Sequence, residues 1–522
     1  MKKIIKLHWN NYKNSDSGKE AIADFDKLTD PNSSMEELLQ LAYKYDHECF
    51  KNSNKIEKDQ EIQFLNYLNT QIQNICSEID ELKQEDVHID YKALSCIFFC
   101  DNEEMGFEDI PQAKFKSVLA TNMMLSIVLS RYFPEYYIPN FFPMQFIYLE
   151  KIAEKYEIEL PNMPNRSDYR GRWLYYDEMC KSINEFAIEN DIQSLSELCA
   201  FFYGYEMEVI KEEMEDEYSK PMPDVPEQAW ILVGNYGEGE KTMKSGFWQS
   251  NQLTCKGDIM LFYEKSPVKK LNAVWTALED GFIDPFGPYY SYSIIGNKIE
   301  IPDDKAITYQ DFKNSDYFKV ENRGKEGNFV SKNFQDISGW SVTSADYSEI
   351  KRMLKAKGFD TSVLPSLYEP KKLAGIEINL EKDVSWKLLV PLLEEMGWKY
   401  KEDFFDEVEF PAGRGTTGHA MAKRSDFCLH MTGTGKGLGA KVVIEAKLNM
   451  KNNEEISENF EQGVSYAKWG NAQVLVLCDK NQIRVYERNK KGEFDENKWK
   501  RFRWEEMENL EKFNELKRML NI

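Results

Sequence analysis

The chain has 522 residues, more than one hydrophobic core normally serves, so we expect about two to four domains. A composition that is 42% hydrophobic and 13% aromatic excludes a disordered chain. The formal net charge of −23 argues against a nucleic-acid partner if that charge is spread evenly along the chain.

The acidic charge is concentrated at the N-terminal end. Residues 1–225 carry about −20, residues 226–370 carry about −3, and residues 371–522 balance near zero. The C-terminal third keeps a basic cluster at residues 498–503, which would meet phosphates, although a solvated surface is the alternative interpretation. The charge therefore leaves a nucleic-acid partner possible for the C-terminal part.

Cysteine usage and hydropathy exclude several other classes. The nine cysteines are scattered and form no zinc-binding spacing with the five histidines. No apolar run is long enough for a membrane span or for a signal peptide. We therefore predict a cytoplasmic protein without a membrane partner.

Residues 1–225 are predicted to be mostly helical. Apolar residues recur three and four positions apart after capping residues at 34–42 and at 60–82. A proline-punctuated stretch at 131–143 leads into an amphipathic helix at 144–156. This part loosely resembles the helical region upstream of the GTPase module in modified-cytosine restriction proteins. We expect this acidic domain to serve oligomerisation, partner docking or regulation.

A linker and a β-rich region follow. Residues 215–228 hold three prolines and many acidic residues, which predicts an extended, exposed linker. The apolar pattern then becomes typical of short strands separated by glycine and proline turns. Three runs have this pattern: 230–233, 258–263 and 272–278. A helix at 347–357 closes the region, so we predict a β domain over residues 226–360.

Short motifs of this domain are similar to those of the EVE branch of the PUA-like superfamily. They are Trp230-Ile-Leu-Val, Gly246-Phe-Trp248, Lys256-Gly-Asp-Ile-Met-Leu-Phe-Tyr263, Asp284-Pro285 and Asn333-Phe-Gln335. The resemblance implies a small β-barrel that binds a modified or flipped base in an aromatic pocket. Stacking on aromatic rings offsets the cost of unstacking a base, which is about a few kcal/mol.

The candidate base-binding residues are aromatic. They are Trp248, Trp230, Phe286, Tyr289 and Tyr290. The alternative is that these rings form the barrel core, and we favour this alternative for Trp230. For Trp248, which stands between Gly246 and a run of polar residues, we favour the pocket. Asp258 follows Gly257 and is interpreted as a turn residue.

A second linker at 358–372 precedes a series of predicted helices and strands. A helix is predicted at 381–396, ending at Gly397-Trp398, and a second one at 454–469. Strands are predicted over 425–431, 440–447, 473–478 and 482–487. The first two of these are joined by a glycine-rich hairpin.

Acidic residues and a lysine occur at the ends of the first two strands. Asp426 begins the first strand, and Glu445 and Lys447 end the second. Strand alternation puts Glu445 and Lys447 on one face, with Ala446 pointing away. Buried charges of this kind must be satisfied, and Mg²⁺ prefers carboxylates and water as ligands. Hydrolysis of a phosphodiester requires such a metal and an activated water.

These residues, in this order, resemble the PD-(D/E)XK nuclease fold, and specifically the N-terminal nuclease domain of type I restriction motor subunits. The matching positions are Glu381, Gly413-Arg414-Gly415, Asp426, Glu445-Ala446-Lys447 and Gln462-Gly-Val-Ser-Tyr466-Ala467. The resemblance implies that Asp426, Glu445 and the carbonyl of Ala446 bind Mg²⁺, for which Mn²⁺ would substitute. It also implies that Lys447 orients or deprotonates the attacking water and that Glu381 helps to hold the metal or that water.

Four further positions are candidates for contact with the substrate. The resemblance implies that Gln462 and Tyr466 position the scissile phosphate or the lysine. Arg414 and His419 are candidates for contact with DNA, and a surface turn is the alternative. A degenerate nuclease fold with an intact motif is the alternative to the whole assignment.

The predicted fold class is multidomain α+β. It comprises a helical N-terminal domain over residues 1–225, a PUA-like (EVE) β-barrel over 226–360 and a C-terminal PD-(D/E)XK α/β nuclease core over 371–522. This combination predicts a modification-dependent DNA endonuclease of a type IV-like restriction system, acting in antiviral defence. A homodimer or higher oligomer is expected, because one active site cuts one strand. The alternatives are a nuclease for modified RNA and a non-catalytic nucleic-acid-binding protein.

Overall fold

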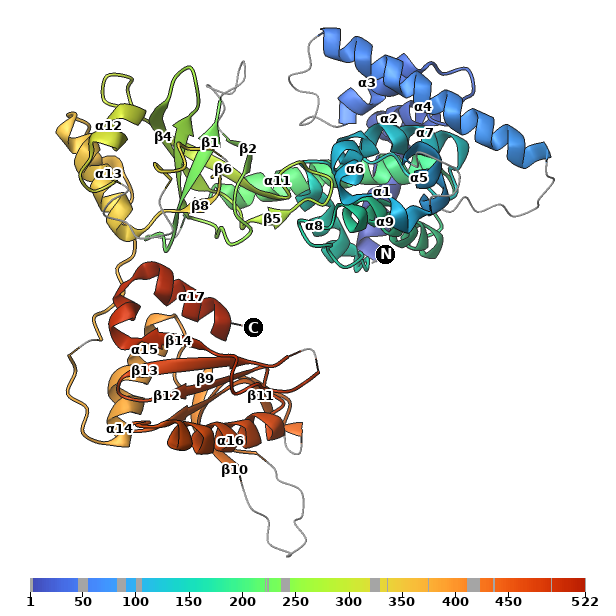
Figure 1. Cartoon of the computed structure of the whole chain (residues 1–522). Coiled ribbons are helices and arrows are strands. Elements are labelled where there is room, and N and C mark those ends of the chain that lie inside the picture. The colour runs from blue at the N-terminus through green and yellow to red at the C-terminus, as the bar shows by residue number, and fades with distance from the viewer. Residues whose placement is uncertain are drawn as a thin grey trace, which may run out of the picture. The chain divides into compact units, whose positions relative to one another are not determined.

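The protein is of mixed α/β type, with a helical N-terminal region and two sheets, one of them a half-barrel (Figure 1). The computed structural model describes residues 3–45, 55–81, 91–99, 106–220, 222, 225–235, 245–319, 329–335, 337–373, 375–410, 423–434, 437–489 and 491–521. The chain forms two compact units. The first comprises Met1–Asp224, Trp230–Trp340 and Lys357–Phe359, and the second comprises Val225–Ala229, Ser341–Ala356 and Asp360–Ile522.

The N-terminal region is helical, as the apolar periodicity predicts. In α3, the buried residues Leu38, Leu39 and Ala42 lie on one face. Ser34 and Glu37 cap this helix reciprocally, through bonds of 2.7 and 3.2 Å between side chains and backbone N–H groups. The helical segments are α1 (Lys3–Asn14), α2 (Asp16–Asp26), α3 (Met35–Tyr45), α4 (Lys55–Glu81), α5 (Tyr91–Phe99), η1 (Phe107–Asp109), α6 (Gln112–Val118), η2 (Leu119–Thr121), α7 (Asn122–Tyr132), α8 (Phe146–Tyr156), α9 (Tyr169–Glu189), α10 (Leu195–Cys199), η3 (Ala200–Glu206) and α11 (Met207–Tyr218).

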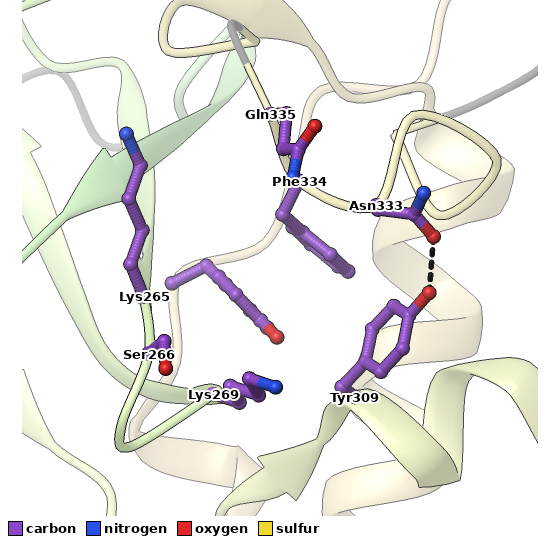
Figure 2. A pocket seen from close by; sticks show the side chains of 8 residues that line it. Lys265, Ser266, Lys269, Tyr309, Asn333, Phe334 and Gln335 are labelled. Carbon is purple, nitrogen blue, oxygen red and sulfur yellow. Dashed lines mark hydrogen bonds between the residues drawn. The ribbon is translucent and has the colours of Figure 1, made fainter.

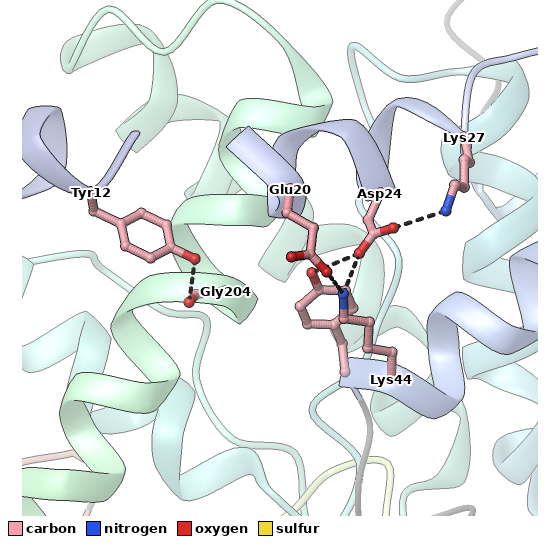
Figure 3. A network of polar contacts seen from close by, with 7 residues as sticks. Tyr12, Glu20, Asp24, Lys27, Lys44 and Gly204 are labelled. Atoms are coloured by element: carbon pink, nitrogen blue, oxygen red, sulfur yellow. Dashed lines mark hydrogen bonds and ion pairs between the residues drawn. The ribbon is translucent and has the colours of Figure 1, made fainter. Parts of the chain in front are cut away.

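Polar contacts join α1 to η3, a π-helical segment, and α3 to α2 (Figure 3). The hydroxyl of Tyr12 donates to the carbonyl of Gly204 at 2.7 Å. The ammonium of Lys44 donates to Glu20 at 2.9 Å and to Asp24 at 2.6 Å. Such exposed ion pairs are worth only about 0–1 kcal/mol each. They therefore fix the positions of the helices more than they stabilise them.

The first sheet has the strand order β2-β6-β4-β3-β1-β8, with β5 paired to β6 and β7 to β4. The runs expected at 230–233, 258–263 and 272–278 are found as β1, β3 and β4, which confirms these predictions. The strands are β1 (Ala229–Gly234), β2 (Ser245–Gln249), β3 (Ile259–Glu264), β4 (Lys270–Ala277), β5 (Phe282–Ile283), β6 (Ser291–Glu300), β7 (Ile307–Thr308) and β8 (Trp340–Ser341). Helix α12 (Tyr309–Asn314) follows β7.

The helical region and the first sheet share one hydrophobic core. Phe286, after β5, packs edge-on against Phe146 of α8, with ring centroids 6.0 Å apart. The buried guanidinium of Arg172 donates to the carbonyls of Pro285 at 2.9 Å and Gly287 at 2.6 Å. The buried carboxylate of Asp284 accepts bonds from three backbone N–H groups, including that of Met144 near α8. These contacts make the two regions one compact unit.

The second unit is a sheet between two layers of helices (Figure 1). Its order is β14-β13-β12-β11-β10-β9, and only β11 and β12 among these neighbours are parallel. One face packs on α15 and α17, and the other packs on α16. The elements are α13 (Ser344–Ala356), η6 (Thr361–Val363), α14 (Glu381–Asp383), η7 (Val384–Leu389), α15 (Val390–Glu395), β9 (Phe404–Phe410), β10 (Lys423–Thr432), β11 (Gly439–Ala446), α16 (Asn453–Trp469), β12 (Val474–Cys478), β13 (Gln482–Glu487), β14 (Lys500–Arg503), η9 (Trp504–Glu508) and α17 (Leu510–Leu520).

The prediction of an extended linker at 215–228 is only partly correct. Helix α11 continues to Tyr218, so the first four residues of that segment are helical. Pro226 is buried, and its carbonyl accepts a bond of 2.9 Å from the N–H of Tyr368. The acidic residues 215–217 extend the helix because glutamate is a good helix former. Proline content therefore predicted the end of the helix too early.

Candidate active site

Strands β10 and β11 bring Asp426 and Glu445 together at one end of the second sheet. Their antiparallel register pairs Phe427 with Ile444, so the next pair in the direction of Ala446 is Asp426 with Glu445. The carboxylate of Asp426 crosses to β11, where its Oδ2 accepts the N–H of Ala446 at 2.7 Å. This bond fixes the Asp426 side chain beside the Glu-Ala-Lys sequence.

The faces of β11 agree with the predicted alternation. Ile444 and Ala446 belong to the core against α15 and α17, whereas Val443 belongs to the core against α16. Glu445 and Lys447 therefore point to the α16 face. Their side chains meet there, with 3.3 Å between Lys447 Nζ and Glu445 Oε2.

Glu445 is the most unusual ionisable group of this cluster. Only 2% of its side chain is exposed, and its Oε1 has no hydrogen-bond partner among the described residues. Burial, aided by the charge of Asp426, raises the pKa of Glu445 to about 8, while Lys447 opposes this shift. A buried carboxylate oxygen without a donor is costly, and a bound cation would remove that cost.

The donor set fits a magnesium ion rather than a zinc ion. Across the described part of the chain, no three His, Cys, Asp or Glu side chains lie close enough to form a metal site. Mg²⁺ is usually held by one or two carboxylates and keeps several waters. Asp426 and Glu445, with the carbonyl of Ala446, would supply such a set. The Oε1 of Glu445, which has no partner among the described residues, is consistent with a bound cation at this position.

Lys447 is held in its charged form. Burial lowers the pKa of its ammonium, but the charges of Glu445, Asp426 and Glu381 outweigh this effect and raise the pKa above its usual value. A lysine with a raised pKa is a poor base at neutral pH. The electrostatics therefore favour orienting the water, one of the two roles expected from the sequence, over deprotonating it.

Glu381 approaches this cluster from the other face of the sheet. It is the first residue of α14, it is exposed, and its charge acts on Lys447. The helix continues through the π-helical η7 into α15 and ends at Glu395, as the predicted helix over 381–396 requires. Glu381 contributes charge to the cluster without a direct hydrogen bond to it among the described residues.

Replacement of Glu381 by glutamine tests this placement. For the phosphodiester cleavage expected from the sequence, the Glu381→Gln variant should be about 10- to 100-fold slower than the wild type, which is the usual loss when a group that orients a metal ligand is removed. The melting temperature should stay within error of the wild type, because the side chain is exposed. Glu394→Gln, on the same helix and equally exposed, is the control and should cleave normally. A normal rate with a lowered melting temperature would make Glu381 a helix-end charge only.

Helix α16 covers the face on which Glu445 and Lys447 lie. Its Gln462 donates to the hydroxyl of Tyr466 at 2.8 Å, so the two predicted phosphate-positioning residues contact each other. The helix lies close to the sheet because Gly463 has no side chain. A Cβ at that position would come within 2.8 Å of Leu475 on β12.

Asp479 was not found by sequence reasoning. This fully buried carboxylate follows β12 and accepts the N–H groups of Met450, Asn481 and Gln482 at 2.8–3.0 Å. It thereby fixes the loop that follows Lys447, as a positioning residue. An aspartate directly after an apolar strand, in Leu477-Cys-Asp479, is the signal that would have found it.

The helix that carries Glu381 also has an unexpected π-helical turn. The N–H of Val390 bonds to the carbonyl of Ser385, five residues back. Pro391 supplies the reason, because it lacks an N–H and its ring crowds the carbonyl four residues earlier. Pro391 was therefore an available signal for this turn.

In the first sheet, Trp230 and Trp248 share the barrel core. Trp230 is 4% exposed and donates through Nε1 to Asp258 at 2.7 Å, so it is a core residue. Asp258 also accepts the N–H of Cys255, as a turn residue does. Trp248 is only half-buried and packs edge-on to Phe262, with ring centroids 4.9 Å apart. Of the two tryptophans, only Trp248 retains surface for a ligand.

The other aromatic candidates do not gather around Trp248. Phe286 is 2% exposed and packs on α8 and α9. Tyr290 is buried, its hydroxyl donates to Pro164 at 2.5 Å, and Arg172 lies over its ring. Tyr289 is half-exposed and stands edge-on to Tyr292. The structure thus places Phe286 and Tyr290 in the contact with the helical region, where they are packing residues rather than a cage.

Basic residues near β13 and β14 form a further part of this unit. Lys498, Lys500 and Arg503 pair with acidic neighbours. Arg484 and Arg501 face each other across the two strands, and neither pairs with a carboxylate within the described ranges. The guanidinium of Arg484 lies 4.1 Å from the centre of the Trp499 ring. Arg414 and His419 lie outside the described residues.

Among the helices that the structure describes, none combines the length and the apolar character that crossing a membrane demands. Comparisons with protein families, with curated proteins and with solved structures find no match to this chain. The site is therefore interpreted from its own geometry.

Proposed function

We propose that this chain is a Mg²⁺-dependent endonuclease of the PD-(D/E)XK type that hydrolyses phosphodiesters in DNA. One observation carries the proposal. The buried carboxylate of Glu445 has an oxygen that no described residue donates to, and it lies between Asp426 and the charged Lys447. A purely structural carboxylate would be satisfied by N–H groups, as Asp479 is in the same sheet. The test is metal-stimulated cleavage that depends on these three residues.

The residues divide the chemistry among them. A bound Mg²⁺ would neutralise developing charge and lower the pKa of a bound water. Asp426 and Glu445 would hold the cation, with the Ala446 carbonyl as a further ligand. Lys447, as an ammonium, orients the water and stabilises negative charge on the phosphate. Gln462 and Tyr466, on the helix over this face, position the scissile phosphate.

A DNA backbone would lie along the same face of the sheet. Tyr486 packs against α16, so Arg484, two residues earlier on β13, points to that face too. Its cross-strand partner is Arg501, and like charges directly opposite each other are unfavourable unless an anion lies between them. A phosphate would satisfy both guanidinium groups. Arg501 is therefore the best-placed residue of the basic cluster at 498–503.

Recognition of a modified base is proposed for the first sheet, at Trp248. Gly234 lies against this ring, and a Cβ there would come within 2.3 Å of it. The tryptophan is thus fixed on one side and half-buried, as a stacking platform requires. A domain that recognises a modified base, here called the reader, joined to a nuclease would act as a modification-dependent, type IV-like restriction enzyme in antiviral defence. A double-strand break would then require a homodimer or a higher oligomer.

Trp248→Ala tests the reader. Stacking contributes about 1–3 kcal/mol per base, so binding to modified DNA should weaken by about 5- to 150-fold. Binding to unmodified DNA of the same sequence should change little, because backbone contacts carry no such preference. The full chain is titrated in EDTA, since the first sheet shares its core with the helices. Tyr67→Ala, an exposed aromatic of α4, is the control. Equal losses on both DNAs would contradict the reader.

A further inference from the structure

A cavity of about 530 Å³ lies beside the hairpin between β3 and β4 (Figure 2), and Trp248 is not among the residues that line it. Phe262 of β3 points into the barrel core and packs on Trp248. Tyr263, the next residue, points to the other face and lines the cavity with residues of α12 and of the segment 329–335. Its size is within the range of about 300–1,000 Å³ that is usual for small-molecule sites.

The wall of this cavity is aromatic and rigid. The rings of Tyr263 and Phe334 are stacked, with centroids 3.7 Å apart and planes 7° from parallel. Phe334 is held from behind by Phe312, at 5.2 Å between ring centroids. Tyr309 stands edge-on to Phe334 and is only half-buried, so its ring offers a stacking surface. Planar ligands bind to such surfaces because every base has a π face.

The backbone of this wall is held in a rare conformation. Asn333 and Phe334 have φ values of 53° and 55°, and neither is glycine. Their N–H groups bond to Val330 at 3.0 Å and Phe329 at 3.1 Å. The side-chain oxygen of Asn333 also accepts the hydroxyl of Tyr309. Two consecutive left-handed residues of this kind are maintained mainly where they position a functional group.

Two lysines at the mouth of the cavity have no counter-ion among the residues that the structure describes. Lys265 and Lys269 line it and are exposed, and neither ammonium makes a hydrogen bond or an ion pair with a residue that the structure describes. The nearby carboxylates are engaged, Glu264 by Asn272 at 2.6 Å and Asp311 by Lys357 at 2.8 Å. In a chain of net charge −23, such cations indicate an anionic ligand.

We propose that this cavity binds a nucleotide, with the base against Tyr309 and the phosphate at Lys265 and Lys269. The amide of Gln335, which is exposed at the rim, provides a donor and an acceptor for a base edge. The nucleotide is either free or part of a single strand, since both present the same base and phosphate. The proposal does not depend on the nuclease or on the Trp248 reader, because it concerns a different cavity.

Equilibrium binding by the full chain in EDTA tests the proposal, because cleavage is then prevented. The probes are adenosine and thymidine 5′-monophosphates, the two nucleosides, ribose 5-phosphate, and a labelled single-stranded oligonucleotide without modified bases. At least one monophosphate should bind about tenfold or more tightly than its nucleoside and than ribose 5-phosphate, because each of these lacks half of the ligand. If neither monophosphate binds, or if ribose 5-phosphate binds as tightly as the monophosphates, the proposal is wrong.

Variants then locate the site. Lys265→Gln with Lys269→Asn should weaken monophosphate binding by about tenfold or more, and Tyr309→Leu by about 5- to 150-fold. Asparagine is chosen at Lys269 because that residue has a positive φ of 53°. Lys305→Gln, on the same unit but outside the cavity, should bind as the wild type does. If the oligonucleotide loses affinity in the same variants, the natural ligand is a strand. If only the monophosphate loses affinity, the natural ligand is a free nucleotide. Unchanged binding by the lysine variant would refute the assignment.

Discussion

Replacement of Glu445 by glutamine is expected to reduce Mg²⁺-stimulated cleavage by about 10³-fold or more. A metal ion contributes several kcal/mol to a phosphodiester transition state, and about 1.4 kcal/mol corresponds to a factor of ten. Glutamine preserves the shape of this buried side chain and removes its charge. The variant should therefore fold, because Oε1 of Glu445 accepts no hydrogen bond from a described residue that the substitution could break. Asp426→Asn and Lys447→Ala should reduce cleavage to a similar extent.

The controls come from the same sheet. Lys441 lies on β11 on the same side as Lys447 but at the other end of the strand, and it is exposed. Lys441→Ala and Glu487→Gln, the latter an exposed position on β13, should cleave at the wild-type rate. Cleavage is measured as single-turnover rates with excess enzyme. A Glu445→Gln variant that cuts at the wild-type rate would place the active site elsewhere.

The second large effect is a pH-dependent stability that Mg²⁺ reverses. In the folded state the pKa of Glu445 is about 8, against an ordinary value of 4.5. Between these values the folded chain keeps a proton that the unfolded chain has released. Raising the pH through this interval therefore lowers the free energy of unfolding, by up to about 1.4 kcal/mol per pH unit. A bound cation favours the ionised carboxylate, so stabilisation by Mg²⁺ should increase with pH.

The comparison of wild type and Glu445→Gln isolates this contribution. Other buried groups, such as Glu150 and Asp284, titrate in the same interval but are shared by both proteins. In EDTA, the free energy of unfolding of the wild type should fall by a few kcal/mol relative to the variant between pH 5 and pH 9. Mg²⁺ at pH 8 should restore it in the wild type only. Equal pH profiles, with or without Mg²⁺, would show that Glu445 binds no cation.

The helices and strands that were expected in the second unit could be predicted because they depend on short-range patterns, whereas β9, β14 and α17 were not predicted. Alternation along β11 identified which side chains share a face, and apolar periodicity identified α16. The approach of Glu381 to Lys447 required only that a helix end lie beside the sheet. The contacts of Asp479 with the loop after β11 join residues 29 apart, and no local pattern encodes them.

The roles of the aromatic residues of the first sheet could not be predicted from local sequence patterns. Phe286 and Tyr290 are aromatic, as the residues of a base-binding pocket are, but they contact residues of the helical region more than 100 positions away in the sequence. Burial of an aromatic ring depends on which surface covers it, and the sequence of one strand does not contain that information. The cavity beside Tyr263 was missed for the same reason, since its wall combines three separate segments.

Cleavage of matched DNAs by the full chain tests the central claim most directly. Phage DNAs with unmodified, methylated, hydroxymethylated and glucosylated bases, with a modified RNA beside them, are incubated with Mg²⁺, Mn²⁺ or EDTA. We predict metal-dependent cleavage of one or more modified DNAs, little cleavage of the unmodified DNA, and none in EDTA or by Glu445→Gln. No cleavage of any DNA with either metal, or equal cleavage in EDTA, would contradict the assignment of Asp426, Glu445 and Lys447 as a nuclease centre.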